Sequence, residues 1–120
     1  MRKLKFRAYQ DGEMSYDVMC GGFEETVPTF FRSGDWIHLD QCKVMQYVGL
    51  RDKSGIEVYE GDVLKHDSTS KSVVSFKNGA FIRKYKNSNI DLLYDAYIED
   101  GVLIAYKVIG NIYENPELIK

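Results

Sequence analysis

The second half of the chain consists of short stretches in which apolar and polar residues alternate. These stretches lie near 56–60, 63–67, 72–77, 80–86 and 102–109, and they are rich in Val, Ile, Phe and Tyr. Alternation with a period of two residues indicates β-strands that have one buried face. Because tight, polar turns separate most of these stretches, we predict five short strands in a small, strongly bent sheet or barrel.

The strongest local signal is the pair Asn78-Gly79 within SVVSFKNGAFIRKYK. This pair is preferred in two-residue type I′ turns, where both central residues need a positive φ angle. Such a turn sets Phe76 opposite Phe81 and Val74 opposite Arg83. A cross-strand aromatic pair contributes about 0.2–1 kcal/mol relative to alanine, and we expect it to anchor the register of this hairpin.

The segment YVGLRDKSGIEVYEGDVLKHD (47–67) contains two further glycine turns. Residues 52–55 fit a hairpin loop, and residues 60–62 form the next corner. Glycine supplies the positive φ angle of such turns, and Asp62 can accept hydrogen bonds from nearby backbone N–H groups. We place Asp52, Glu57, Glu60 and Asp62 at turns or on solvent-facing strand positions. The segment is therefore interpreted as architectural and not as a pair of catalytic carboxylates.

The N-terminal part has a weaker pattern. Alternation over residues 4–8 predicts a half-buried strand that ends at Asp11-Gly12. Glycine and proline are frequent in residues 20–35, so we expect an irregular loop there, with at most a short strand or one helical turn. The predicted layout is one mainly β domain over 1–120, with a mixed, irregular N-terminal region (1–45) and a barrel (46–120).

Residues 88–109 carry two conflicting signals. Apolar residues recur at helical spacing from Ile90 to Ile98, and Ser88 stands where it can cap a short helix. Asp100-Gly101, in contrast, is a hairpin signal between two segments that are rich in strand-forming residues. We predict a strand pair over 96–109 and leave the conformation of 88–95 open.

Composition limits the class of protein. The chain has 120 residues, 44% hydrophobic and 28% charged, and a formal net charge of −2. These values suit one folded domain and do not suggest a general polyanion binder. The sequence shows neither a secretory signal nor a run of about 20 apolar residues, so we expect no membrane segment. Cys20 and Cys42 are then expected to be reduced, inert thiols in a cytoplasmic protein.

The residues that could carry chemistry form no recognisable set. His38, Asp40 and Cys42 alternate and could approach one ion, but only Cys20 or His66 could complete a zinc site, at no known spacing. A Cys42–His66 dyad has no supporting signature, and neither a nucleophile elbow nor a phosphate-binding loop is present. We therefore predict no metal, no cofactor and no enzymatic activity.

Three segments together resemble a known family. LKFRAY (4–9), MQYVGLRDKSGIEVYEGDVLK (45–65) and VIGNIYENPEL (108–118) are similar to the YopX family of phage and prophage proteins. The resemblance spans nearly the whole chain. It implies an SH3-like β-barrel in the C-terminal part, a more variable N-terminal region, and a phage-encoded protein in a bacterial cytoplasm. It implies no established molecular function, and so it carries over no catalytic or binding residue.

Two kinds of binding remain as hypotheses. Nine tyrosines are spread along the chain, and a small domain is expected to leave some of them exposed. Exposed tyrosines are enriched at protein–protein interfaces. We therefore expect a non-catalytic accessory protein. It acts either through contacts with a protein partner that the sequence does not identify or through self-association as a homo-oligomer. The alternative is a weak nucleic-acid binder. Its candidate contact residues are Arg83, Lys84, Tyr85 and Lys86, helped by the basic residues at the N-terminus.

Overall fold

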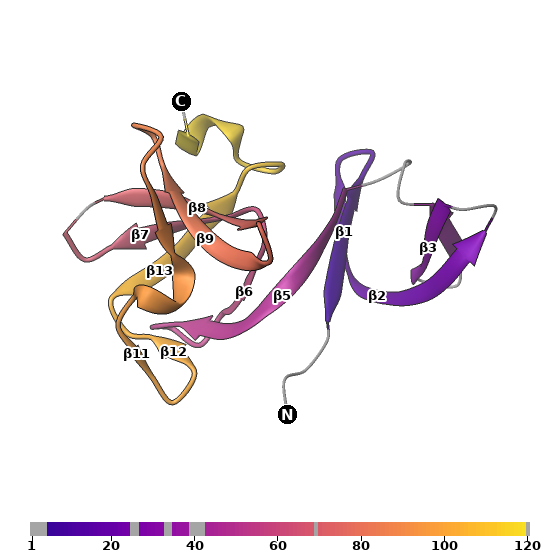
Figure 1. The fold of residues 1–120 in the computed structure, drawn as a ribbon. Helices are drawn as coiled ribbons and strands as arrows, with labels where there is room; N and C mark the ends of the chain where they lie inside the picture. Colours follow the sequence, from indigo (N-terminus) through magenta and orange to yellow (C-terminus); the bar gives the residue numbers. More distant parts are fainter. Residues whose placement is uncertain (1–4, 25–26, 33–34, 39–42, 69, 120) are drawn as a thin grey trace. The chain divides into compact units, whose positions relative to one another are not determined.

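A computed structural model describes the chain except residues 1–4, 25–26, 33–34, 39–42, 69 and 120, and it does not describe the side chains of residues 17 and 19–42 (Figure 1). The protein is mainly β, as predicted, and its described part contains 3₁₀ turns but no α-helix. Two compact units follow each other along the chain, Met1–Tyr47 and Val48–Lys120. The boundary falls inside strand β5 (Lys43–Asp52), whose first half belongs to unit 1 and whose second half belongs to unit 2.

Unit 1 is an antiparallel arrangement of strands. Its elements are β1 (Phe6–Gln10), β2 (Glu13–Glu24), β3 (Val27–Arg32), β4 (Asp35–His38) and the first half of β5, in the order β5-β1-β2-β3-β4. The expectation of an irregular loop over residues 20–35 was wrong. Gly21-Gly22 does not end a strand, because the register between β2 and β3 shifts there and both strands continue past the irregularity.

Unit 2 contains the remaining strands. They are the second half of β5, β6 (Glu57–Tyr59), β7 (Asp62–His66), β8 (Lys71–Lys77), β9 (Ala80–Tyr85), β10 (Ile90–Leu92), β11 (Ile98–Glu99), β12 (Val102–Leu103) and β13 (Tyr106–Asn111). Five form a sheet in the order β10-β9-β8-β7-β13, while β5 pairs with β6 and β12, and β12 with β11. In the described residues these pairings do not close into a barrel.

Most of the predicted strands of unit 2 are confirmed, but the last one is divided. The stretch 102–109 was expected to be one strand. It instead forms β12 and β13, separated at Ile104-Ala105, because β12 pairs with β5 whereas β13 pairs with β7. Residues 102–109 thus contribute strands to two different sheets, and the chain changes direction between β12 and β13. The Asp100-Gly101 hairpin is confirmed, since Ile98 lies opposite Leu103 and both turn residues have positive φ angles.

The open question of residues 88–95 has a mixed answer. Strand β10 is followed by one 3₁₀ turn, η2 (Leu93–Asp95). Leu93 is fully buried, whereas its neighbours Leu92 and Tyr94 are about half exposed. The helical spacing in the sequence therefore does not mark a helix: Leu93 is buried, Ile98 packs against the core, and Ile90, Tyr94 and Tyr97 reach the surface.

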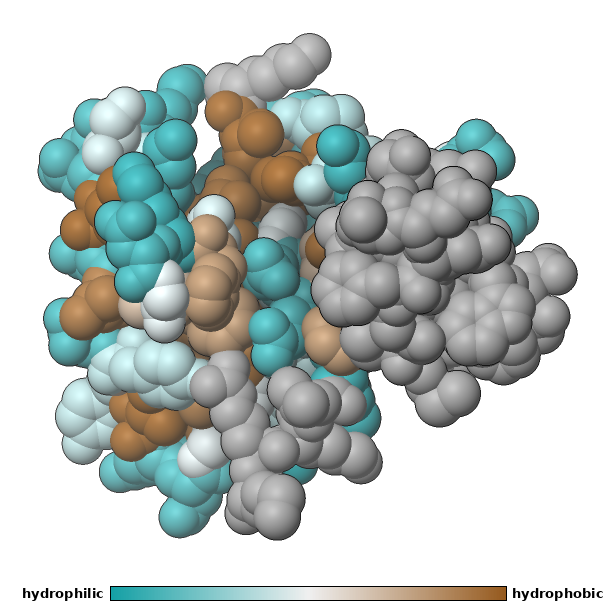
Figure 2. Space-filling model, turned by 45° about the vertical axis from the view of Figure 1, so that its right-hand side comes forward, coloured by the Kyte–Doolittle hydropathy of each residue, from teal (hydrophilic) through white to brown (hydrophobic). Residues whose placement is uncertain are grey.

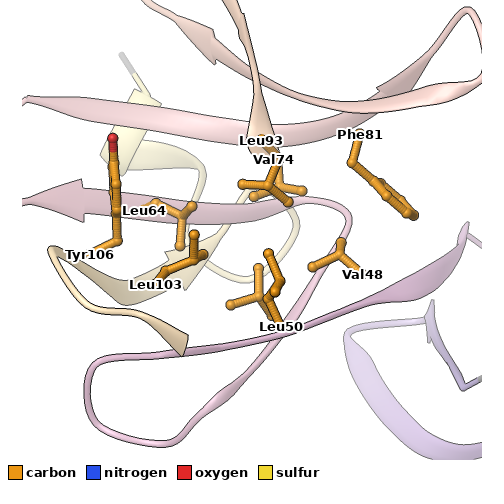
Figure 3. Close-up of a cluster of buried hydrophobic side chains, with 9 residues drawn as sticks. Val48, Leu50, Leu64, Val74, Phe81, Leu93, Leu103 and Tyr106 are labelled. Atoms are coloured by element: carbon orange, nitrogen blue, oxygen red, sulfur yellow. The ribbon is translucent and has the colours of Figure 1, made fainter. Parts of the chain in front are cut away.

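The core of unit 2 is a single cluster of apolar side chains drawn from distant parts of the segment (Figure 3). Its members come from β5 to β9, η2, β12 and β13: Val48, Leu50, Val58, Leu64, Val74, Phe81, Leu93, Leu103 and Tyr106. Burying one such side chain stabilises the fold by about 1.5–3 kcal/mol. This cluster holds β7, β8 and β9 in place, and these strands carry the candidate site.

Two aspartates that we placed at solvent-facing or turn positions are buried. The Asp62 side chain accepts a hydrogen bond from the Tyr59 N–H at 2.8 Å, which confirms its predicted role at the corner. Asp52 is fully buried, and its Oδ1 accepts from the N–H groups of Ser54 and Ile56 at 2.8 and 2.9 Å. Its Oδ2 accepts from the Val108 N–H at 2.8 Å, so one carboxylate joins the first hairpin to β13.

The Asn78-Gly79 turn has the predicted geometry. Both residues have positive φ angles, 53° and 82°, and Phe76 lies opposite Phe81. Their ring centroids are 5.0 Å apart with an interplanar angle of 77°, an edge-to-face arrangement. Phe81 is buried in the core, whereas Phe76 is 48% exposed and packs its ring against that of Phe81.

We expect the losses caused by Phe76→Ala and Phe81→Ala to be coupled. Edge-to-face aromatic pairs contribute about 0.5–1.5 kcal/mol beyond the area that they bury, and each single substitution removes that same contribution. The double variant should therefore lose less stability than the sum of the two single variants. Urea unfolding of all four proteins measures this coupling. Strictly additive losses would mean that the two rings do not interact.

Candidate binding cleft

Unit 2 has a cleft of about 530 Å³ between one face of the sheet and the C-terminal segment. Its apolar wall consists of Val63, Val73, Ile112, Leu118 and Ile119. The first two lie on β7 and β8, and the other three lie in the C-terminal segment that follows β13. The cleft thus has aliphatic side chains on both sides.

Three lysines line the same cleft. Lys71 begins β8, Lys84 lies on β9 opposite Val73, and Lys86 follows the end of β9. All three side chains are exposed, and no acidic residue of the described chain lines the cleft. The protein as a whole carries a net charge of −2, so this positive rim is a local feature and not a consequence of composition.

Backbone contacts hold the C-terminal wall of the cleft. The Ile112 N–H donates to the Gly61 carbonyl at 2.9 Å, and the Asn111 N–H donates to Oδ1 of Asn115 at 3.2 Å. Gly110 allows this packing, because a Cβ atom there would lie 2.6 Å from both the Asn115 and the Leu118 side chains. The glycine of the VIGNIYENPEL motif therefore fixes where Leu118 lies against the cleft.

The predicted contact cluster Arg83–Lys86 divides between two sides of β9. Lys84 and Lys86 are exposed at the cleft, whereas Arg83 is only 5% exposed and faces the core. The Arg83 guanidinium donates to the Leu92 carbonyl at 3.2 and 3.0 Å and to the hydroxyl groups of Tyr106 and Tyr85. Successive side chains of a β-strand point to opposite faces of the sheet, and this explains why Arg83 and Lys84 lie on different sides. Arg83 thus has a structural role, and it does not join the lysine rim.

Tyr85 lines the cleft but stays an uncharged phenol. Partial burial raises the pKa of its hydroxyl above the ordinary value, and the neighbouring Arg83 charge counteracts this only in part. It therefore adds an aromatic side chain without a negative charge to the cleft near neutral pH, while its hydroxyl group accepts a hydrogen bond from Arg83. Sequence reasoning missed Lys71, because strand pairing brings it beside Lys84 and Lys86 from a distance of more than ten residues along the chain.

A second surface of unit 2 is apolar and acidic. In the segment that follows β9, several large side chains are exposed: Ile90, Leu92, Tyr94 and Tyr97. Tyr97 is the most exposed of them, at 65%. This confirms that the fold leaves part of the tyrosines at the surface, since Tyr47, Tyr59 and Tyr106 are buried. Figure 2 shows hydrophobic residues, in brown, among hydrophilic ones on one face of the protein.

The residues considered for metal binding or catalysis lie mostly outside the described part. Asp40 and Cys42 are not described, and neither are the side chains of Cys20 and His38. His66 is described, and its Nδ1 lies 2.6 Å from the Ser68 hydroxyl group, within a local turn. Where side chains are described, we find no group of three or more residues suited to holding a metal ion. The same part of the chain contains no helix with the length and apolarity of a membrane span.

Fold and surface together define a small, mainly β protein in two units, with a lysine-rimmed aliphatic cleft on the second. The sequence profile of the YopX protein family matches residues 5–120, and the chain belongs to that family. A crystal structure of the protein EF1440 from Enterococcus faecalis is similar over 100% of both chains, with a TM-score of 0.76 and 25% sequence identity. No curated protein matches the chain.

Proposed function

We propose that this chain is a non-catalytic accessory protein of a phage or prophage, and that it acts in the bacterial cytoplasm through protein contacts. The observation that supports this function is the cleft of unit 2, which combines an aliphatic wall with a rim of three lysines. A cleft of this composition suits a protein segment in which apolar side chains alternate with carboxylates. Family membership supports the phage origin and names no competing activity.

The two parts of the cleft contribute differently to binding. Each apolar side chain that the aliphatic wall fully buries contributes about 1.5–3 kcal/mol, so this wall supplies most of the affinity. An exposed ion pair contributes only about 0.2–1 kcal/mol. The three lysines, Lys71, Lys84 and Lys86, therefore contribute more to binding specificity than to affinity. The preferred partner is then acidic and apolar, and its affinity decreases with salt concentration.

Three further properties belong to the same proposal. Unit 2 is an open variant of an SH3-like barrel, and the short, antiparallel strands of its five-stranded sheet support this part of the proposal. The protein needs no cofactor, and its two buried aspartates serve the backbone and not a reaction. It also acts as a homo-oligomer, which is in keeping with the exposed apolar residues between β9 and β12.

Nucleic-acid binding is the second candidate, since the lysine rim also suits phosphate groups. Single-strand binders combine such a rim with aromatic side chains on which bases stack. The cleft has one aromatic lining residue, Tyr85, and Arg83 of the predicted contact set is engaged with Leu92, Tyr85 and Tyr106. Aliphatic lining therefore favours a protein segment over a nucleic acid.

Fluorescence anisotropy separates the two candidates. The probes are a labelled peptide of alternating leucine and glutamate, a peptide of equal length with lysine in place of glutamate, and a labelled single-stranded oligonucleotide. We expect the acidic peptide to bind saturably at low salt and the other two probes to bind at least about tenfold more weakly, a difference of about 1.4 kcal/mol. Stronger binding of the oligonucleotide, or equal binding of both peptides, would contradict the proposed function.

A further inference from the structure

We propose that the cleft of unit 2 takes up the acidic, apolar segment 93–100 from a second copy of this chain. This inference rests on the proposed function, because it uses the same cleft, and it names the partner. The complementary surface lies on the same unit, in the residues around η2 and β11.

The segment has the composition that the cleft selects. Its carboxylates Asp95, Glu99 and Asp100 are exposed, and the ring of Tyr97 is 65% exposed between them. The sequence contains no lysine or arginine from residue 87 to residue 106. Among the described residues of unit 2, Tyr97 is the most exposed large hydrophobic side chain. It lies within this acidic stretch.

The segment is held in a fixed shape that projects Tyr97. The buried Leu93 anchors one end, and the Tyr94 hydroxyl donates to the Val48 carbonyl at 2.6 Å. At the other end Ile98 pairs with Leu103. A segment anchored on both sides does not fold back into the cleft of its own unit, and none of the residues 90–100 lines that cleft. Contact with a second copy therefore needs little ordering of either surface, which favours binding.

The two surfaces are complementary in charge and in polarity. Lys71, Lys84 and Lys86 would face carboxylates of the segment, and the aliphatic wall would receive the Tyr97 ring. An exposed tyrosine that enters an apolar pocket and keeps its hydroxyl group wet is a common interface anchor. In a two-fold symmetric dimer each copy supplies both surfaces, so the contact is made twice.

Charge exchange between the two surfaces tests the inference on the full-length chain. One variant carries Lys84→Glu and Lys86→Glu, a second carries Asp95→Lys and Glu99→Lys, and a third combines all four substitutions. Sedimentation velocity over a range of protein and salt concentrations gives the oligomeric state of each. The control variant, Lys77→Glu with Lys107→Glu, makes the same charge change at exposed lysines that do not line the cleft.

We expect the wild-type chain and the control to associate reversibly, and more weakly as salt increases. Each two-site variant should raise the dissociation constant of the dimer by about tenfold or more, and the four-site variant should restore association. Thermal unfolding confirms that all variants fold. A monomeric wild-type chain, or a lysine variant that associates as the control does, overturns the inference. Binding of the acidic peptide by a monomeric chain would retain protein contact through the cleft as the function, and it would refute both self-docking and the proposed homo-oligomer.

Discussion

Replacement of Asp52 by alanine is expected to lower the free energy of unfolding by about 3–5 kcal/mol, because it leaves several backbone N–H groups without their acceptor. The carboxylate accepts hydrogen bonds from Ser54 and Ile56 within the first hairpin of unit 2 and from Val108 on β13. It is fully buried, so water does not replace these bonds without a local opening of the fold.

Urea unfolding followed by fluorescence measures this effect. Asp67→Ala is the matched control, because Asp67 is an exposed aspartate whose carboxylate forms an ion pair with Lys53 at 2.7 Å. An exposed ion pair contributes at most about 1 kcal/mol, so the control should remain close to the wild type. Equal effects of the two substitutions would contradict the role that we assign to Asp52.

Leu93→Ala should destabilise unit 2 by about 2–5 kcal/mol, the usual range for a large-to-small substitution at a fully buried leucine. Leu93 is the inward-facing residue of the turn η2, and it packs in the cluster with Val74 and Leu103. Its loss removes apolar contacts, leaves a cavity, and releases the anchor of the acidic segment 93–100.

The neighbouring Leu92 provides the comparison for this prediction. Its side chain is 48% exposed, and Leu92→Ala keeps the carbonyl group that Arg83 binds. We expect this control to lose less than about 1 kcal/mol. Thermal unfolding of both variants gives the difference. A larger loss for Leu92→Ala than for Leu93→Ala would mean that the segment faces the core with its other side.

Local patterns predicted much of unit 2. Asn78-Gly79 and Asp100-Gly101 specify two-residue turns, and a two-residue turn determines which residues face each other on both strands. The sequence could not show that 102–109 divides, because the break depends on two partner strands that are distant along the chain. The loop expected over residues 20–35 was wrong for a related reason. Glycines that often end strands can instead sit at a bulge between paired ones.

The candidate site was only half predictable. A cationic cluster on β9 was recognised from the sequence, and two of its members, Lys84 and Lys86, do line the cleft. The buried position of Arg83 follows from strand alternation once the buried face is known, and the sequence left that face undetermined. Lys71 and the C-terminal wall join the cleft through tertiary contacts, for which no local pattern exists.

The measurement that tests the central claim most directly is the affinity of the acidic leucine–glutamate peptide for the Lys84→Glu, Lys86→Glu variant. The variant with Lys77→Glu and Lys107→Glu is titrated beside it, so that net charge is equal in the two proteins. We predict that the cleft variant binds the peptide at least about tenfold more weakly than the wild type. The control should bind nearly as tightly as the wild type, with only the small loss that its changed net charge causes. Equal affinities of the two variants would show that the lysine-rimmed cleft is not the binding site.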